Sequence, residues 1–218
     1  MFNPAHSIGF IFMTLDVSPV RRPRAGRPPA VAEPRERILD AAAKLFARCG
    51  YENSSIADLA AAVGVSKAAI YHYYTTKQEI YDAIILNVLA GLTSEVSKAV
   101  AQATTAHARL RQFMVTHARY FERAHPQFVT MLISYSAMSV PDQQDAARLR
   151  DGYEQLLRDI IQEGITRGEF RQVDVAATGR AVLSMLNWMA RWYRPGGPDT
   201  AEAIAEGYFD LISGGMNA

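Results

Sequence analysis

Several side chains that donate hydrogen bonds gather within eleven residues in the first third of the chain. They include Lys67, Tyr71, His72, Tyr73 and Lys77. Ammonium, phenol and imidazole groups bind phosphate oxygens and the edges of nucleic-acid bases. So many polar and aromatic tips argue against a helix that is buried on every side, and they favour recognition of a nucleic acid.

Two short helices joined by a tight turn are expected to position these side chains. Ser55 is a suitable helix N-cap, and Asp58 stands where the acid of a capping box would be. Gly64 ends the first helix in the left-handed conformation, and Ser66 caps a second helix that runs to Tyr74. This outline predicts a helix-turn-helix, whose second helix lies in the major groove of DNA. A helical hairpin within a bundle has the same outline, but the polar tips count against it.

Charge is distributed unevenly along the 218 residues. The net charge is only +1, yet residues 21–80 carry ten basic and six acidic side chains, so the remainder of the chain sums to −3. A basic first third suits a part that faces phosphates. The single cysteine, Cys49, excludes an internal disulfide and is expected in the core, on the apolar side of the first helix.

Residues 1–33 are predicted to form a disordered basic arm. Proline and glycine between the arginines prevent a helix, and the arm has the charge to place Arg24 or Arg27 in a narrow minor groove. A solvated tail without contacts is the alternative. The apolar patch Ile8–Met13 is too short to cross a membrane and lacks the features of a signal peptide. We therefore expect a cytoplasmic, nucleoid-associated protein with no membrane contact.

The whole chain is predicted to be all-α, with about nine helices. A first helix over Pro34–Cys49 joins the two short ones in a three-helix DNA-binding domain at residues 34–80. A long helix from Lys77 to about Ala103 then leads into a second helical domain at residues 81–218. Its further helices are expected at about 107–125, from 126, 140–168, 173–193 and 200–213.

No catalytic pattern stands out in the sequence. The five histidines lack metal-ligand spacing, and no nucleophile elbow, P-loop or dinucleotide fingerprint is present. We therefore expect no cofactor, no metal and no enzymatic activity. A helical ligand-binding enzyme is the distant alternative.

The segment from about Arg35 to Ile85 resembles the DNA-binding domain of the TetR family of bacterial transcriptional regulators. The resemblance lies in ILDAAAKLFARCGYENSSIADLAAAVGVSKAAIYHYYTTKQEIYDAI, which matches without a gap. It implies that Ser66–Tyr74 is the recognition helix. Together with the residue chemistry, it assigns phosphate contacts to Ser55, Tyr71, Tyr73 and Lys77. Base reading is left to Lys67, Ala68 and His72, near the helix start at Ser66.

The resemblance also implies a homodimer and a small-molecule inducer. The dimer would form through the last two long helices, about 173–193 and 200–213, the first of which is apolar on two faces. Methionines and aromatic residues in the middle helices are either core or pocket. The candidate pocket residues are Met114, His117, Phe121, Phe128, Met131, Tyr135, Tyr153, Met185 and Trp188.

The ligand class is read from a second, shorter resemblance. The stretch from Trp192 to Pro198 resembles a segment of TetR-type regulators of lipid and steroid catabolism. This implies a repressor that is released from operator DNA by an acyl-CoA thioester or a lipid or steroid catabolite. A TetR-type regulator of drug efflux, which responds to bulky hydrophobic compounds, is the alternative.

Overall fold

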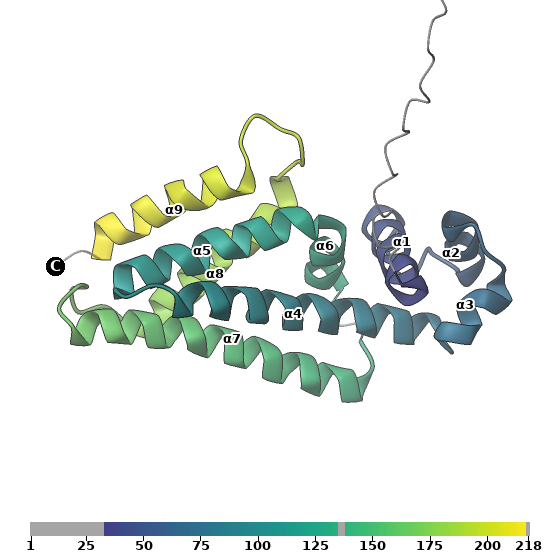
Figure 1. The fold of residues 1–218 in the computed structure, drawn as a ribbon, viewed down its shortest axis with the longest axis horizontal. Coiled ribbons are helices and arrows are strands. Elements are labelled where there is room, and N and C mark those ends of the chain that lie inside the picture. Colours follow the sequence, from purple (N-terminus) through teal and green to yellow (C-terminus); the bar gives the residue numbers. More distant parts are fainter. Residues whose placement is uncertain (1–32, 135–137, 217–218) are drawn as a thin grey trace, which may run out of the picture. The chain divides into compact units, whose positions relative to one another are not determined.

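The described part of the chain is built from helices alone. The computed structural model describes residues 33–134 and 138–216. Within them, nine helices follow one another and no strand occurs, so the all-α prediction is confirmed. In chain order they are α1 (Pro34–Cys49), α2 (Ile56–Val63), α3 (Lys67–Tyr73), α4 (Lys77–Ala101), α5 (Ala106–Arg123), α6 (His125–Ser134), α7 (Val140–Thr166), α8 (Val175–Trp192) and α9 (Ala201–Met216) (Figure 1).

The short helices begin and end where their capping residues require. The Ser55 hydroxyl accepts from the Asp58 amide, and the Asp58 carboxylate accepts from the Ser55 amide, which completes the predicted capping box. Gly64 ends α2 at φ 78°, a conformation that glycine adopts without a steric penalty. Ser66 caps α3 by accepting from the Ala69 amide. These local bonds fix the turn between α2 and α3.

Helix α4 joins helices α1 to α3 to the rest of the described chain. It contacts α1 as well as α5, α6 and α7 (Figure 1). Ten of its 25 residues are buried. Among the described helices, it alone is long and apolar enough to span a membrane. Its packing between other helices accounts for that apolarity, because a helix surrounded by neighbours is apolar on several sides.

The prediction that Cys49 belongs to the core is wrong. Cys49 is exposed, although it lies three and four residues beyond the buried Phe46 and Leu45. The buried face of α1 ends at Phe46, because Gly50 turns the chain away one turn later. The apolar periodicity of α1 continues to its last residue, but the segments that pack against its buried face do not extend that far.

Candidate DNA-binding surface and ligand cavity

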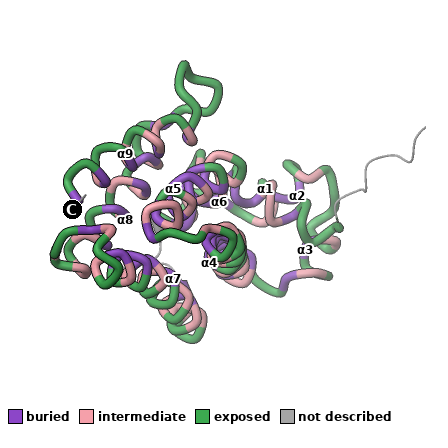
Figure 2. Tube along the Cα trace, turned by 60° about the vertical axis from the view of Figure 1, so that its left-hand side comes forward, coloured by how far each residue is buried: buried purple, intermediate pink, exposed green. Residues whose placement is uncertain are grey.

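Helix α3 is anchored by its inner face and leaves its outer face open. Ile70 and the cap residue Tyr74, four residues apart, are almost fully buried, and the Arg35 guanidinium lies 4.9 Å from the centre of the Tyr74 ring. Figure 2 shows α3 coloured mostly as exposed. An element held this firmly on one side presents the opposite side as a rigid surface.

The exposed side of α3 carries the residues that the sequence assigned to DNA. Lys67, Ala68 and His72 are exposed, and Tyr71 retains 51% of its accessible surface. Tyr73 is half-buried, and the centre of its ring lies 4.9 Å from the centre of the His72 ring in an edge-to-face arrangement. The structure therefore brings one ammonium, one imidazole and two phenols onto a single short helix. Its length and exposure suit a groove of duplex DNA.

Several residues that were predicted to contact DNA either form hydrogen bonds within the protein or lie outside the described residues. The Lys77 ammonium donates to the carbonyls of Tyr51 (2.8 Å) and Ser54 (2.9 Å) and lies 4.0 Å from the centre of the Tyr51 ring. The Ser55 hydroxyl donates to Asp58 at 2.6 Å, and this bonding lowers the pKa of the Asp58 carboxyl. Lys77 thus fastens the start of α4 to the connection between α1 and α2. Arg24 and Arg27 lie outside the described residues.

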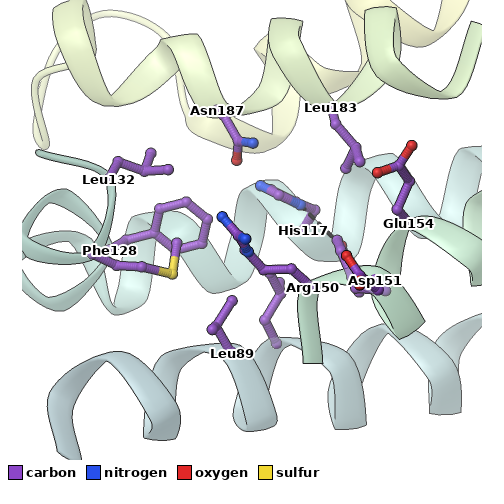
Figure 3. Close-up of a pocket in the computed structure, with 12 residues that line it drawn as sticks. Leu89, His117, Phe128, Leu132, Arg150, Asp151, Glu154, Leu183 and Asn187 are labelled. Carbon is purple, nitrogen blue, oxygen red and sulfur yellow. Dashed lines mark hydrogen bonds between the residues drawn. The ribbon is translucent and has the colours of Figure 1, made fainter. Parts of the chain in front are cut away.

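A cavity of about 440 Å³ opens between α4, α5, α6, α7 and α8. Four predicted pocket residues line it, namely His117, Phe128, Met131 and Tyr153. No pattern in the sequence indicated the others, which are Leu89, Leu92, Leu132, Arg150, Asp151, Glu154, Leu183 and Asn187 (Figure 3). The buried members form an apolar inner part, whereas Arg150 and Asp151 are exposed. The cavity therefore suits a molecule that is apolar at one end and polar at the other.

The remaining pocket candidates fall outside this lining. Met114 and Phe121 are fully buried in the core, and Met185 is half-buried on α8. Trp188 lines a second, more open hollow of about 470 Å³ on α8, together with Leu132 and Arg191. Tyr135 lies outside the described residues. A stripe of methionines and aromatics thus divides between core and cavity, a division that helical spacing alone does not make.

The polar group deepest in the cavity wall is His117. Its Nδ1 lies 2.9 Å from the Tyr153 hydroxyl, and the two rings are packed against Phe128 and Phe113. Burial lowers the pKa of His117 to about 3 and raises the pKa of Tyr153 well above its ordinary value. Both groups are therefore neutral at pH 7. Among the described residues, no partner meets His117 Nε2.

Two sets of bonds connect the cavity helices to the DNA-binding helices. On α6, the Thr130 hydroxyl lies 2.9 Å from the Pro126 carbonyl of its own helix and 3.2 Å from the Ala43 carbonyl of α1, and Gln127 donates to Asp40 at 2.6 Å. These two residues neighbour the cavity residues Phe128 and Met131 along α6. Helix α6 therefore touches the cavity on one side and α1 on another.

The second set runs through α4. Tyr51 donates to Gln78 (2.9 Å), Gln78 donates to Asp82 (2.8 Å), and the Ser139 amide donates to Asp82 at 3.3 Å. Burial raises the pKa of the Asp82 carboxyl. Ser139 precedes α7, the helix that carries Tyr153 into the cavity wall. A polar chain thus joins the α1–α2 connection to the start of α7, which no local sequence signal predicted.

Comparison with known proteins gives matches over both parts of the chain. The family model described as "Bacterial regulatory proteins, tetR family" matches residues 38–84, and the model "Tetracyclin repressor-like, C-terminal domain" matches residues 103–216. Together they cover the helix-turn-helix and the cavity helices α5 to α8, whereas the lining residues Leu89 and Leu92 of α4 lie between the two matched ranges.

Solved structures agree with these matches. The TetR family transcriptional regulator PfmR from Thermus thermophilus is 50% identical, with a TM-score of 0.78 over 81% of this chain and 96% of that one. The ketosteroid transcriptional regulator KstR2 of Mycobacterium tuberculosis is 26% identical, with a TM-score of 0.81 over 86% and 97%. AibR, solved in complex with isovaleryl coenzyme A and operator DNA, is 25% identical, with a TM-score of 0.75 over 82% and 97%.

Proposed function

The chain belongs to the TetR family of bacterial transcriptional regulators, and from this premise we propose that it is a repressor released from its operator by a small molecule. As a member of that family it is a regulator and not an enzyme. The observation that carries the proposal is the pairing of an exposed, firmly anchored α3 with a cavity whose wall helices also hold the DNA-binding helices. It acts in the cytoplasm, on the nucleoid.

The DNA-binding domain comprises residues 34–80 and the ligand-binding and dimerisation domain residues 81–218. Lys67, Ala68 and His72 face base edges from the groove side of α3, and Tyr71 and Tyr73 donate to phosphates. The backbone amides at the starts of α2, α3 and α4, next to Ser55, Ser66 and Lys77, reinforce these contacts. The basic arm adds Arg24 and Arg27.

A homodimer that forms through α8 and α9 presents two copies of α3, one for each half-site of the operator. The support is a set of large apolar side chains that the single chain leaves uncovered. Trp188 on α8 keeps 61% of its surface exposed, Trp192 45%, and Leu211 on α9 69%. Exposed aromatic and aliphatic side chains concentrated on two neighbouring helices are typical of protein–protein interfaces.

The ligand class that fits best is an acyl-CoA thioester or a related lipid or steroid catabolite. The cavity is apolar inside and charged at its exposed end, which suits a molecule with a hydrocarbon body and a polar head. AibR was solved with an acyl coenzyme A and operator DNA, and KstR2 is named for ketosteroids, so the same classes are the first to test here.

A regulator of drug efflux remains the second candidate, on one specific observation. Asp151 and Glu154 line the cavity, and carboxylates there favour bulky cations. Glu154 is already paired with Arg158, however, and Arg150 lines the same region, which reduces that attraction.

The test is a mobility shift with the DNA that flanks its own gene. We expect a retarded complex that isovaleryl-CoA or octanoyl-CoA dissolves and that free coenzyme A leaves intact. Release by ethidium and not by either thioester would favour the efflux candidate. Equal retention of unrelated DNA of the same length, at every salt concentration, would refute operator recognition.

A further inference from the structure

We propose that His117 is a carbonyl reader, whose Nε2–H donates to one uncharged oxygen of the ligand at the inner end of the cavity. The ligand class it selects is that of thioesters, esters and ketones, with the hydrocarbon part against Phe128 and Met131. This inference rests on the proposed function only in treating the cavity as the ligand site.

The bond to Tyr153 decides which nitrogen carries the proton. A neutral imidazole has one N–H, and Nδ1 lies 2.9 Å from the Tyr153 hydroxyl. If that hydroxyl donates to Nδ1, the hydroxyl and Nδ1 are both satisfied and the proton sits on Nε2, whose N–H alone lacks a partner among the described residues. If Nδ1–H donated instead, the phenol hydrogen would need a second acceptor, and Nε2 would be left as a bare acceptor without a partner among the described residues. The first arrangement leaves fewer buried groups unsatisfied.

The position of Nε2 makes it useful to a ligand. His117 is 1% exposed, lines the cavity, and has no partner for Nε2 within the described ranges. Figure 3 shows its ring reaching into the space bounded by Phe128, Arg150 and Asn187. Buried polar groups in folded proteins are nearly always paired, so an unpaired donor in a cavity wall is a position that a bound molecule can satisfy.

The surroundings favour an uncharged oxygen over a carboxylate. Apart from the Tyr153 hydroxyl, the ring packed against His117 is the apolar Phe128, and the imidazole itself is neutral. The charged lining residues Arg150, Asp151 and Glu154 all come from α7 and retain solvent contact. Because Glu154 is paired with Arg158, one cation and one acid remain in this lining and give an anion no net attraction, whereas a carbonyl avoids the cost of burying a charge.

The first test needs no ligand. In protein labelled with ¹⁵N at histidine, the ring-nitrogen shifts distinguish the two tautomers. We expect His117 to be the neutral Nε2–H form throughout the pH range in which the protein is folded. The Tyr153→Phe variant keeps the ring against Phe113 but lacks the hydroxyl that donates to Nδ1. The Nδ1–H tautomer of His117 should therefore appear. An Nδ1–H tautomer or an imidazolium in the unmodified protein at neutral pH would overturn the proposal.

The second test compares three probes of similar shape, 4-phenylbutan-2-one, butylbenzene and 4-phenylbutanoate, by calorimetry. The ketone should bind about ten- to a hundredfold more tightly than the hydrocarbon, which is the range for one buried hydrogen bond. His117→Leu should abolish that preference. His117→Gln, which keeps an N–H near the position of Nε2, should restore part of it.

His125→Phe is the matched control, because His125 also has an unpaired buried Nε2 but does not line the cavity. It should leave the ketone preference unchanged. Failure of the ketone to bind the unmodified protein, tighter binding of the carboxylate, or a preference that survives in His117→Leu would each overturn the carbonyl reader. Operator retention, measured on the same samples, reports on the proposed function separately, so either conclusion can fail alone.

Discussion

Lys77 has two candidate roles, a contact with a DNA phosphate and hydrogen bonds within the protein. The sequence does not distinguish them, but they lead to different measured results. In the structure its ammonium donates to the carbonyls of Tyr51 and Ser54 and lies over the Tyr51 ring. Hydrogen bonds to charged groups contribute about 1.5–3 kcal/mol each, and part of this is offset because Lys77 is only half-buried. We expect Lys77→Met to lower the free energy of unfolding by about 2–4 kcal/mol.

The assay pairs urea unfolding with the salt dependence of operator affinity. Removing one phosphate contact from a duplex complex reduces the slope of log K against log salt concentration by about one unit. If Lys77 stays on the two carbonyls, Lys77→Met loses stability while its salt slope changes by less than about half a unit. Lys67→Ala is the matched control: Lys67 is exposed on α3 and is assigned to a base edge, so its stability should hold while its base preference changes. Unchanged unfolding with a flattened slope in Lys77→Met would refute the fastening role.

Three further predictions concern one exposed phenol, one buried carboxyl and one uncovered indole. Tyr71→Phe should weaken operator binding about tenfold in a mobility shift, with unfolding unchanged, since the phenol is exposed; equal affinity would remove Tyr71 from the phosphate contacts. Burial raises the pKa of Asp82, so the folded state holds that proton more tightly, and stability falls as pH rises through the folded pKa. Asp82→Asn should lose this part of the decline, which sets in as pH rises above the ordinary pKa of an aspartate, and parallel profiles would contradict it. Trp188→Glu should yield monomers in sedimentation and weaken operator binding, whereas an unchanged dimer would place the interface elsewhere.

Capping residues made the small helices predictable from the sequence. Ser55, Asp58, Gly64 and Ser66 act on neighbours within four residues, so their types and spacing define the helix ends without any tertiary contact. The same holds for Pro34 at the first turn of α1. The inward positions of Ile70 and Tyr74 also followed, because four-residue spacing places both on one face.

Contacts between distant segments were not predictable in the same way. The Lys77 ammonium meets carbonyls 23 and 26 residues earlier, and Asp82 accepts from an amide 57 residues later. Cavity residues were missed for the same reason, since Leu89 and Asn187 look like ordinary helix positions until five helices are assembled. Periodicity reports which face of a helix is buried, and it does not report what that face meets.

The placement of the cavity sets a condition on how any ligand can control DNA binding. A ligand shifts an equilibrium only as far as its affinities for the two states differ. Filling the cavity therefore releases DNA only if the filled cavity disfavours the arrangement of α6 on α1 or of α7 on α4 that positions α3. Thr130 with Ala43 and Ser139 with Asp82 make those contacts, and both lie one or a few turns from lining residues. A molecule that satisfies His117 without displacing the α6 side chains around it would then bind tightly and still leave the operator occupied. Affinity and induction are thus separable properties of this cavity.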